Sequence, residues 1–275
     1  LYLFLLVLST PLFAVDTDGD GYSDAEEIAY GSDHNDEADE PLMVTNWPLV
    51  SLINSSSANR AQISLSFDDR ESVAYFHKNR SLFLDRGITA TLFVDRFAYR
   101  NSIEQNDILI ELQTLGFEIA SHTENHRDMI AHISEFGIDH YLEYEIKRPI
   151  DYLTEIGIQV RALSYPFGIF DAQVNSLIIS EYNLRTRGVA DAGGVIFGQS
   201  GSTVMAHSID EGGISLQQAK VAVSEIAKQK GTIFFYGHVI NDSYDTRYHT
   251  PPSFLKELID YAQSLDVGFC NFSEC

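Results

Sequence analysis

The stretch AQISLSFDD (residues 61–69) is a largely apolar run that ends in two adjacent carboxylates. We expect a strand over residues 61–67, which places Asp68 and Asp69 at its carboxyl end. Three later motifs also follow apolar runs that are typical of strands: HTENH (122–126), YPFG (165–168) and FYGH (235–238). We expect all four motifs to meet at one rim of the same sheet or barrel.

Predicted strands and helices alternate along the rest of the chain. The strands are expected at 61–67, 88–94, 117–120, 160–164, 184–189, 232–236 and 267–269, and the helices at 71–86, 103–115, 134–156, 172–180, 216–229 and 252–265. Alternation of this kind predicts an α/β fold, a parallel sheet or barrel with helices outside. Functional residues collect at the carboxyl ends of such strands, where the four motifs lie.

Length and composition limit what the chain can be. Its 275 residues, 44% hydrophobic and 12% aromatic, can form one domain of over 200 residues plus a short module. A net charge of -22 argues against a nucleic-acid or anionic-membrane partner, because a phosphate backbone needs basic neutralisation. Half of this charge lies in the first 41 residues, which hold 11 acidic and no basic side chains.

The first residues resemble a secretory signal peptide. Residues 1–8 are apolar and a small residue, Ala14, follows at the expected cleavage end. We expect an incomplete signal peptide over 1–14 and a secreted, periplasmic or cell-surface protein; a retained anchor is the alternative, although the segment is short for a membrane span. In an oxidising compartment Cys270 and Cys275 could close a small loop, or remain free or intermolecular thiols.

The segment DTDGDGYSDAEE (16–27) has the pattern of a calcium loop. Acids stand at the first, third, fifth, ninth and twelfth positions and a glycine at the sixth, which supplies an oxygen cage. The expected ligands are Asp16, Asp18, Asp20, Tyr22 through its carbonyl, Asp24 and Glu27. The segment resembles a thrombospondin type 3 repeat, so we expect a calcium-stabilised clip over 15–40; a solvated acidic linker is the alternative. A linker over 41–59 then leads into the main domain, 60–275.

The four strand-end motifs contain the parts of a hydrolytic metal site. Asp69, His122 and His126 offer one carboxylate and two imidazoles, a ligand set for zinc or another divalent transition metal with an open position. Asp68 is the candidate base for a metal-bound water, and His238 the candidate acid for the leaving group. Alternatively, the aspartates cap the next helix and the histidines lie on surface loops.

Together, these motifs resemble the polysaccharide deacetylase family, the NodB-homology domain of carbohydrate esterase family 4. The resemblance runs from about residue 63 to residue 272 and preserves the order of the motifs. It implies a distorted (β/α)7 barrel, a divalent metal, and hydrolysis of N-acetyl or sometimes O-acetyl groups on an amino-sugar polymer. It also implies that Asp68 is the base, that Asp69, His122 and His126 hold the metal, and that His238 is the acid.

Three positions depart from the family pattern. Arg70 replaces a common glycine at the mouth of the pocket, and Ser164 stands where many relatives place an arginine that steers the base. The nearest arginine in sequence is Arg161. The Asp-Trp element that tunes the acid histidine in the family has no clean counterpart, and Asp191 is only a candidate for it. The YPFG turn is similar to the branch that acts on poly-N-acetylglucosamine.

The turn also supplies candidate contacts to the reacting group. The backbone N–H of Phe167 is expected to help bind a developing oxyanion. Substrate contacts are expected from Arg70, Tyr165 and Phe167.

We therefore expect a hydrolase of carbon–nitrogen bonds other than peptide bonds, a deacetylase of poly-N-acetylglucosamine, a chitin-like polymer or peptidoglycan. An amidohydrolase that acts on a non-sugar amide would keep the same site. A non-catalytic, calcium-dependent carbohydrate-binding surface protein is the third possibility, but a binding module needs neither a base nor an acid beside an open metal.

Overall fold

A computed structural model of the chain describes residues 17, 35, 60–95, 103–190, 203–242 and 248–275. The chain divides into two compact units, residues 1–48 and 49–275, and every helix and strand reported below belongs to the second. The expected signal peptide and the calcium ligands Asp16, Asp18, Asp20, Tyr22, Asp24 and Glu27 lie outside the described residues, as does Asp191.

Parallel strands close into a barrel. Within the described residues the order runs from β1 to β7, and β7 pairs back with β1 along its length. The strands are β1 (Gln62–Asp68), β2 (Thr91–Val94), β3 (Glu118–Ser121), β4 (Ala162–Ser164), β5 (Arg185–Val189), β6 (Thr203–Ser208) and β7 (Thr232–Gly237). The short β10 (Gly268–Phe269) pairs with the start of β1, whereas β2 pairs with the end of β1. The predicted (β/α)7 barrel is confirmed.

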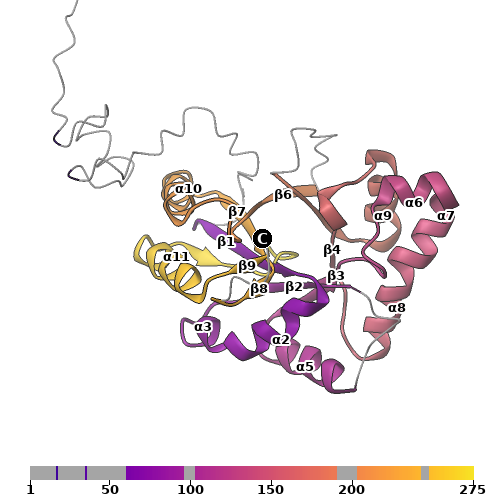
Figure 1. Cartoon of the computed structure of the whole chain (residues 1–275), viewed down its shortest axis with the longest axis horizontal. Helices are drawn as coiled ribbons and strands as arrows, with labels where there is room; N and C mark the ends of the chain where they lie inside the picture. Colours follow the sequence, from indigo (N-terminus) through magenta and orange to yellow (C-terminus); the bar gives the residue numbers. More distant parts are fainter. Residues whose placement is uncertain (1–16, 18–34, 36–59, 96–102, 191–202, 243–247) are drawn as a thin grey trace, which may run out of the picture. The chain divides into compact units, whose positions relative to one another are not determined.

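Helices lie outside the ring of strands (Figure 1). They are α2 (Arg70–Asn79), α3 (Ser81–Leu84), α5 (Ile103–Thr114), α6 (Met129–Phe136), α7 (Ile138–Tyr141), the π-helix η1 (Leu142–Lys147), α8 (Arg148–Glu155), the 3-10 turn η2 (Pro166–Gly168), α9 (Ala172–Tyr182), α10 (Leu216–Gln229) and α11 (Pro252–Ser264). Two short strands, β8 (Val239–Ile240) and β9 (His249–Thr250), pair beside the barrel.

The predicted helix over 134–156 is wrong in its start and in its continuity. It begins earlier, at Met129, where Asp128 caps α6 by accepting a hydrogen bond from Ala131 N. It breaks at Gly137, whose φ of 88° is accessible to glycine and costly for other residues. A π-helical stretch then separates α7 from α8.

An apolar layer closes the amino-terminal end of the barrel. Phe272, from the segment after β10, packs edge-on against Phe93 and Phe234, with ring centroids 5.4 Å apart in each pair. Its backbone N–H donates to Thr91 Oγ1 at 2.8 Å, and a disulfide between Cys270 and Cys275 closes the loop around it. The polar chemistry is therefore left to the opposite, carboxyl-terminal end.

We predict that Phe272→Ala lowers the free energy of unfolding by about 3–5 kcal/mol, because it empties a fully buried aromatic site. Urea unfolding followed by circular dichroism measures the change. The matched control is Phe136→Ala, since Phe136 is 53% exposed and its loss should cost less than about 1 kcal/mol. Equal losses of stability in the two variants would contradict the conclusion that Phe272 is a core residue that closes the end of the barrel.

Candidate active site

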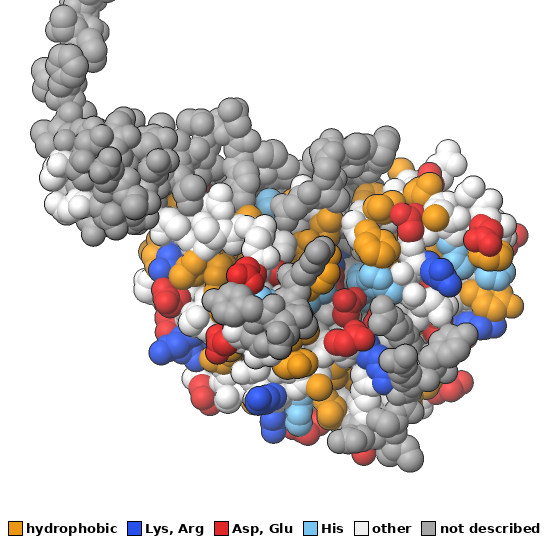
Figure 2. Space-filling model, viewed as in Figure 1, with side chains coloured by type: hydrophobic (Ala, Val, Ile, Leu, Met, Phe, Trp, Pro, Cys, Tyr) orange, Lys and Arg blue, Asp and Glu red, His pale blue; other side chains and the backbone are white. Residues whose placement is uncertain are grey.

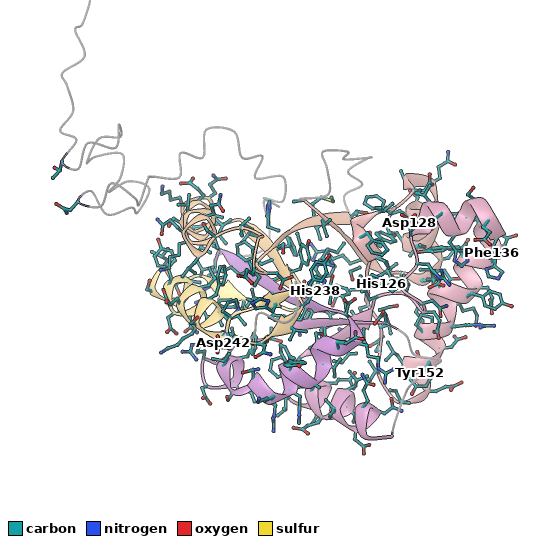
Figure 3. The ribbon with its side chains drawn as sticks, viewed as in Figure 1. His126, Asp128, Phe136, Tyr152, His238 and Asp242 are labelled. Atoms are coloured by element: carbon teal, nitrogen blue, oxygen red, sulfur yellow. A yellow bond between two sulfur atoms is a disulfide. The ribbon has the colours of Figure 1, made fainter. Side chains whose placement is uncertain are left out.

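The carboxyl ends of the strands surround one cavity of about 340 Å³. Its lining residues are Asp68, Asp69, His122, His126, Tyr165, Phe167, Gly168, Val189, Tyr236, His238 and Tyr248. Histidine and acidic side chains lie next to one another on the face shown in Figure 2. His126 and His238 lie toward the middle of the domain (Figure 3). The structure therefore brings together residues from all four sequence motifs.

Three of these residues offer metal-ligand atoms that converge. Asp69 Oδ1 lies 3.6 Å from His122 Nε2 and 3.4 Å from His126 Nε2. One ligand atom from each residue lies within 4.8 Å of the others. Asp69 and His126 have positive φ angles of 71° and 55°, so tight turns at two strand ends aim both side chains. One oxygen and two nitrogen ligands fit zinc or a similar divalent ion.

The protonation state of His122 also suits a ligand. Its Nδ1 lies 2.9 Å from the carbonyl oxygen of Ser164, which only accepts, so Nδ1 carries the proton and Nε2 presents its lone pair. Burial lowers the pKa of His122 to about 3, although the charge of Asp68 opposes this. The imidazole is thus neutral at physiological pH.

Asp68 is buried beside this cluster, with Oδ2 3.8 Å from His122 Nε2. Arg187 from β5 donates from Nη2 to the same Oδ2. Burial by itself raises the pKa of Asp68. The charges of Arg187, His122 and His238 and the hydrogen bond from Arg187 together outweigh burial, so the net pKa is lowered. Asp68 is therefore an ionised carboxylate inside the barrel, as a base requires.

Arg187 is an arginine beside Asp68 that the sequence motifs did not predict. It is fully buried, and its guanidinium lies 4.6 Å from the ring centroid of Tyr236 and 5.1 Å from that of Phe93. Ser164, which stands in the expected arginine position, instead contacts His122 Nδ1 through Oγ at 2.6 Å. The sequence feature that could have indicated this role is the position of Arg187, a charged residue two positions before the end of a strand that is expected to be buried.

His238 is held by Asp210, a second residue that the sequence motifs did not predict. Nδ1 of His238 lies 2.5 Å from Asp210 Oδ2, and its backbone N–H donates to Oδ1 at 3.0 Å. Thr250 Oγ1 also donates to Oδ1, at 2.9 Å. Burial by itself lowers the pKa of His238, but the hydrogen bond and charge of Asp210 outweigh it and raise the pKa. Such a histidine keeps its proton to higher pH, as an acid requires.

The remaining predicted contacts are divided between the cavity and its surroundings. Phe167 lines the cavity with φ 59° and ψ 6°, and its ring centroid lies 4.8 Å from that of His126. The next residue must be glycine, because a Cβ on Gly168 would lie 2.2 Å from Val189 Cγ2. The turn is therefore fixed tightly against β5.

Tyr165 and Arg70 point their polar groups away from the cavity. The hydroxyl of Tyr165 donates to Asn175 Oδ1 at 2.7 Å, on the helix side of β4. Arg70 Nε donates to Gln105 Oε1 at 2.7 Å, and Arg70 is not among the cavity residues in the described part of the chain. Both polar groups are thus engaged by other side chains, and the expected substrate contacts of Tyr165 and Arg70 stay predictions.

Comparisons with known proteins agree with this architecture. A sequence model of the polysaccharide deacetylase family matches residues 55–186, and a model of the bacterial TSP3 repeat matches residues 16–36. No curated protein sequence matches the chain.

In the part of the chain that the structure describes, no helix has the length and apolarity needed to cross a membrane.

Several solved structures share the fold. The peptidoglycan N-acetylglucosamine deacetylase Bc1960 is 15% identical, with a TM-score of 0.56 over 82% of this chain and 90% of its own. The catalytic domain of a peptidoglycan N-acetylglucosamine deacetylase from Eubacterium rectale is 13% identical, with a TM-score of 0.54 over 83% and 93%. BA3943 of Bacillus anthracis, described as a CE4 pseudoenzyme, is 14% identical, with a TM-score of 0.51 over 78% and 65%.

The domain thus has the NodB-type barrel of the carbohydrate esterase family 4 deacetylases. The family match and the shared fold together support a polysaccharide deacetylase domain. Because a pseudoenzyme has the same barrel, the fold alone does not decide activity, which depends on the residues of the site.

We predict that Asp210→Asn lowers the pKa of His238, because it removes the negative charge that offsets burial. The histidine ring signals in an NMR pH titration of the metal-free protein measure this pKa. The control is Asp128→Asn, whose carboxylate caps α6. An unchanged His238 titration in Asp210→Asn would contradict the proposed pairing.

We predict that Arg187→Met lowers the free energy of unfolding at neutral pH by about 3–5 kcal/mol, because it leaves the buried charge of Asp68 uncompensated. Urea unfolding measures the loss. Adding Asp68→Asn to the same protein removes the stranded charge and should restore part of the stability, which a double-mutant cycle quantifies. Additive losses would contradict a direct interaction between the two side chains.

Proposed function

We propose that this domain is a metal-dependent deacetylase that removes N-acetyl groups from an amino-sugar polymer. The observation that carries the proposal is the coexistence in one cavity of a metal-ligand triad, a buried ionised carboxylate and a histidine with a raised pKa. A carboxylate and a histidine whose pKa values are shifted in opposite directions are suited to act as base and acid at the same pH.

Each residue then has a separate role. A divalent ion held by Asp69, His122 and His126 would act as a Lewis acid on the acetyl carbonyl and lower the pKa of water. Asp68 accepts the proton of the attacking water, and His238 donates a proton to the departing amine nitrogen. The bond between the acetyl carbon and nitrogen breaks, so that acetate and a free amine result.

The rim of the cavity favours a sugar substrate. Phe167 is 57% exposed and Tyr248 60% exposed, and each ring lies 4.8–4.9 Å from a site histidine, His126 and His238 respectively. Exposed aromatic faces suit the apolar faces of pyranose rings, as their amphipathic character predicts. Poly-N-acetylglucosamine, a chitin-like polymer and peptidoglycan all contain N-acetylglucosamine, a pyranose with an N-acetyl group. Two of the compared structures are described as peptidoglycan N-acetylglucosamine deacetylases.

The surrounding assignments belong to the same proposal. Zinc or another divalent transition metal is the proposed catalytic ion, and calcium is proposed to stabilise the segment matched by the TSP3 model. We propose a secreted, periplasmic or cell-surface location. The disulfide between Cys270 and Cys275 supports an oxidising compartment.

Acetate release from short β-linked N-acetylglucosamine oligomers tests the proposed function. We expect release that is abolished by a chelator and restored by zinc. Asp68→Asn should reduce the rate by about 10²–10⁴-fold, the usual effect of removing a general base. Asp139→Asn, which changes an exposed acid on α7, is the matched control and should leave the rate unchanged.

The outcomes separate the candidate functions. If a folded, zinc-loaded protein released no acetate from the N-acetylglucosamine oligomers, the deacetylase proposal would be overturned. Release from small non-sugar N-acetyl amides in the same assay would then favour an amidohydrolase, whereas binding of the oligomers without release would favour a carbohydrate-binding protein.

A further inference from the structure

The metal ligand His126 sits at the end of a strained loop, residues 123–126. Thr123 and His126 have positive φ angles of 68° and 55°, a region that non-glycine residues rarely adopt. Inside the loop, His126 N donates to Thr123 Oγ1 at 3.2 Å. A backbone of this kind persists when surrounding contacts hold it in place.

Glu145, on the π-helix η1, supplies those contacts. Its Oε2 accepts a hydrogen bond from Asn125 N at 2.8 Å, and its Oε1 accepts one from Asn125 Nδ2 at 2.9 Å. Its main-chain carbonyl accepts from Glu124 N at 3.1 Å. One residue therefore holds the two positions immediately before His126 with three hydrogen bonds.

The Glu145 carboxylate depends on the loop in return. The residue is 1% exposed, and no lysine or arginine in the described residues forms an ion pair with it. A histidine lies close to it: His132 Nδ1 is 3.8 Å from Oε1. Burial of a carboxylate is costly unless hydrogen bonds compensate it, so displacing the loop would leave this group uncompensated.

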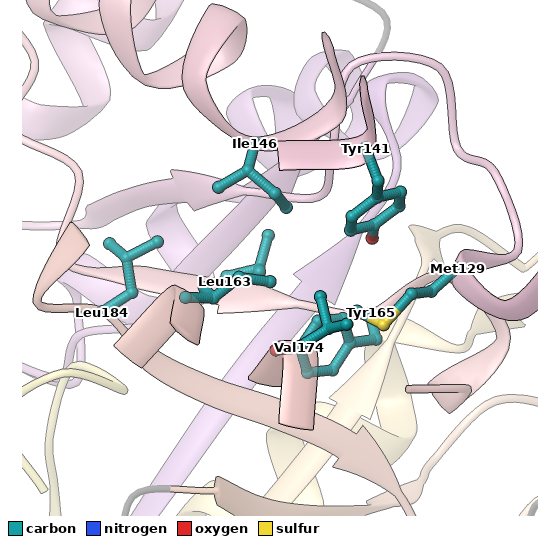
Figure 4. Packing of buried hydrophobic residues seen from close by; sticks show 8 residues of the cluster. Met129, Tyr141, Ile146, Leu163, Tyr165, Val174 and Leu184 are labelled. Atoms are coloured by element: carbon teal, nitrogen blue, oxygen red, sulfur yellow. The ribbon is translucent and has the colours of Figure 1, made fainter. Parts of the chain in front are cut away.

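The helix that carries Glu145 is anchored in the core. Tyr141 and Ile146, on either side of Glu145, are fully buried in a cluster with Leu163 and Tyr165 (Figure 4). The π-helical turn brings the consecutive residues Glu145 and Ile146 inward together, and such turns are frequent at functional sites. Glu145 is thereby presented to the loop from a rigid support.

We propose that Glu145 is a positioning residue for the metal site: it fixes the loop 123–126 so that His126 Nε2 faces Asp69 and His122. This inference rests on the metal triad of the proposed function. It assigns to a buried acid, 20 positions from Asn125 in the sequence, the role of setting metal affinity without contact to the metal. Groups that orient metal ligands commonly contribute about 10–100-fold to affinity.

The test compares Glu145→Gln with Glu143→Gln, which removes the same charge from an exposed position on the same π-helix. Competition of the metal-free protein with a chromophoric chelator gives the dissociation constant for zinc. We expect it to rise by about 10–100-fold in Glu145→Gln, because one amide nitrogen would face an Asn125 donor, and to stay unchanged in Glu143→Gln.

A second variant separates geometry from charge. Asn125→Ala removes the side-chain partner while the Glu145 charge remains, and it should also weaken zinc binding. Urea unfolding of the metal-free variants completes the comparison, since a purely structural role would lower stability and leave the zinc dissociation constant unchanged.

Two results would overturn the inference. The first is zinc binding within threefold of wild type in both Glu145→Gln and Asn125→Ala, which would leave the deacetylase proposal intact. The second is a wild-type protein that binds no zinc, which would overturn the metal triad together with the role of Glu145.

Discussion

The ion pair between Asp68 and Arg187 is the constraint on which the site depends. Both side chains are withdrawn from water, and neither charge could remain inside the barrel without the other. The pair joins β1 to β5 across a sequence separation of 119 residues, so it exists only in the closed barrel. The aromatic rings of Phe93 and Tyr236 flank the guanidinium of Arg187. The Asp68 carboxylate supplies the negative charge that these neutral rings do not.

One small cavity therefore holds two titratable groups whose pKa values are shifted in opposite directions, Asp68 and His238. Desolvation opposes the charged form of both Asp68 and His238, yet the groups of opposite charge around each of them together overcome it. Arg187 makes the leading contribution to the lowered pKa of Asp68, and Asp210 makes the leading contribution to the raised pKa of His238. His122 has no such dominant partner, so burial leaves it neutral, the form in which an imidazole binds a metal.

The chain reaches this arrangement with its own supporting residues. The arginine beside Asp68 comes from β5 rather than from the end of β4, where the family pattern led us to expect it, and Ser164 at that position contacts His122 Nδ1. The left-handed loop that carries His126 is supported by Glu145 from a π-helix. The residues of the site are thus held by supports from elements that lie far from them in the sequence.

The sequence alone determined the α/β barrel and the residues at its rim. Periodicity and strand-end motifs are local properties, and all four motifs do surround one cavity. It did not predict β6, because Thr203, His207 and Ser208 interrupt the apolar pattern, and so Asp210, two residues beyond that strand, was missed. Only the tertiary structure decided the partners of the site, Arg187, Asp210 and Glu145, because each acts through contacts between elements distant in the sequence. A buried charge is recognisable as necessary only when the group that compensates it has been placed beside it.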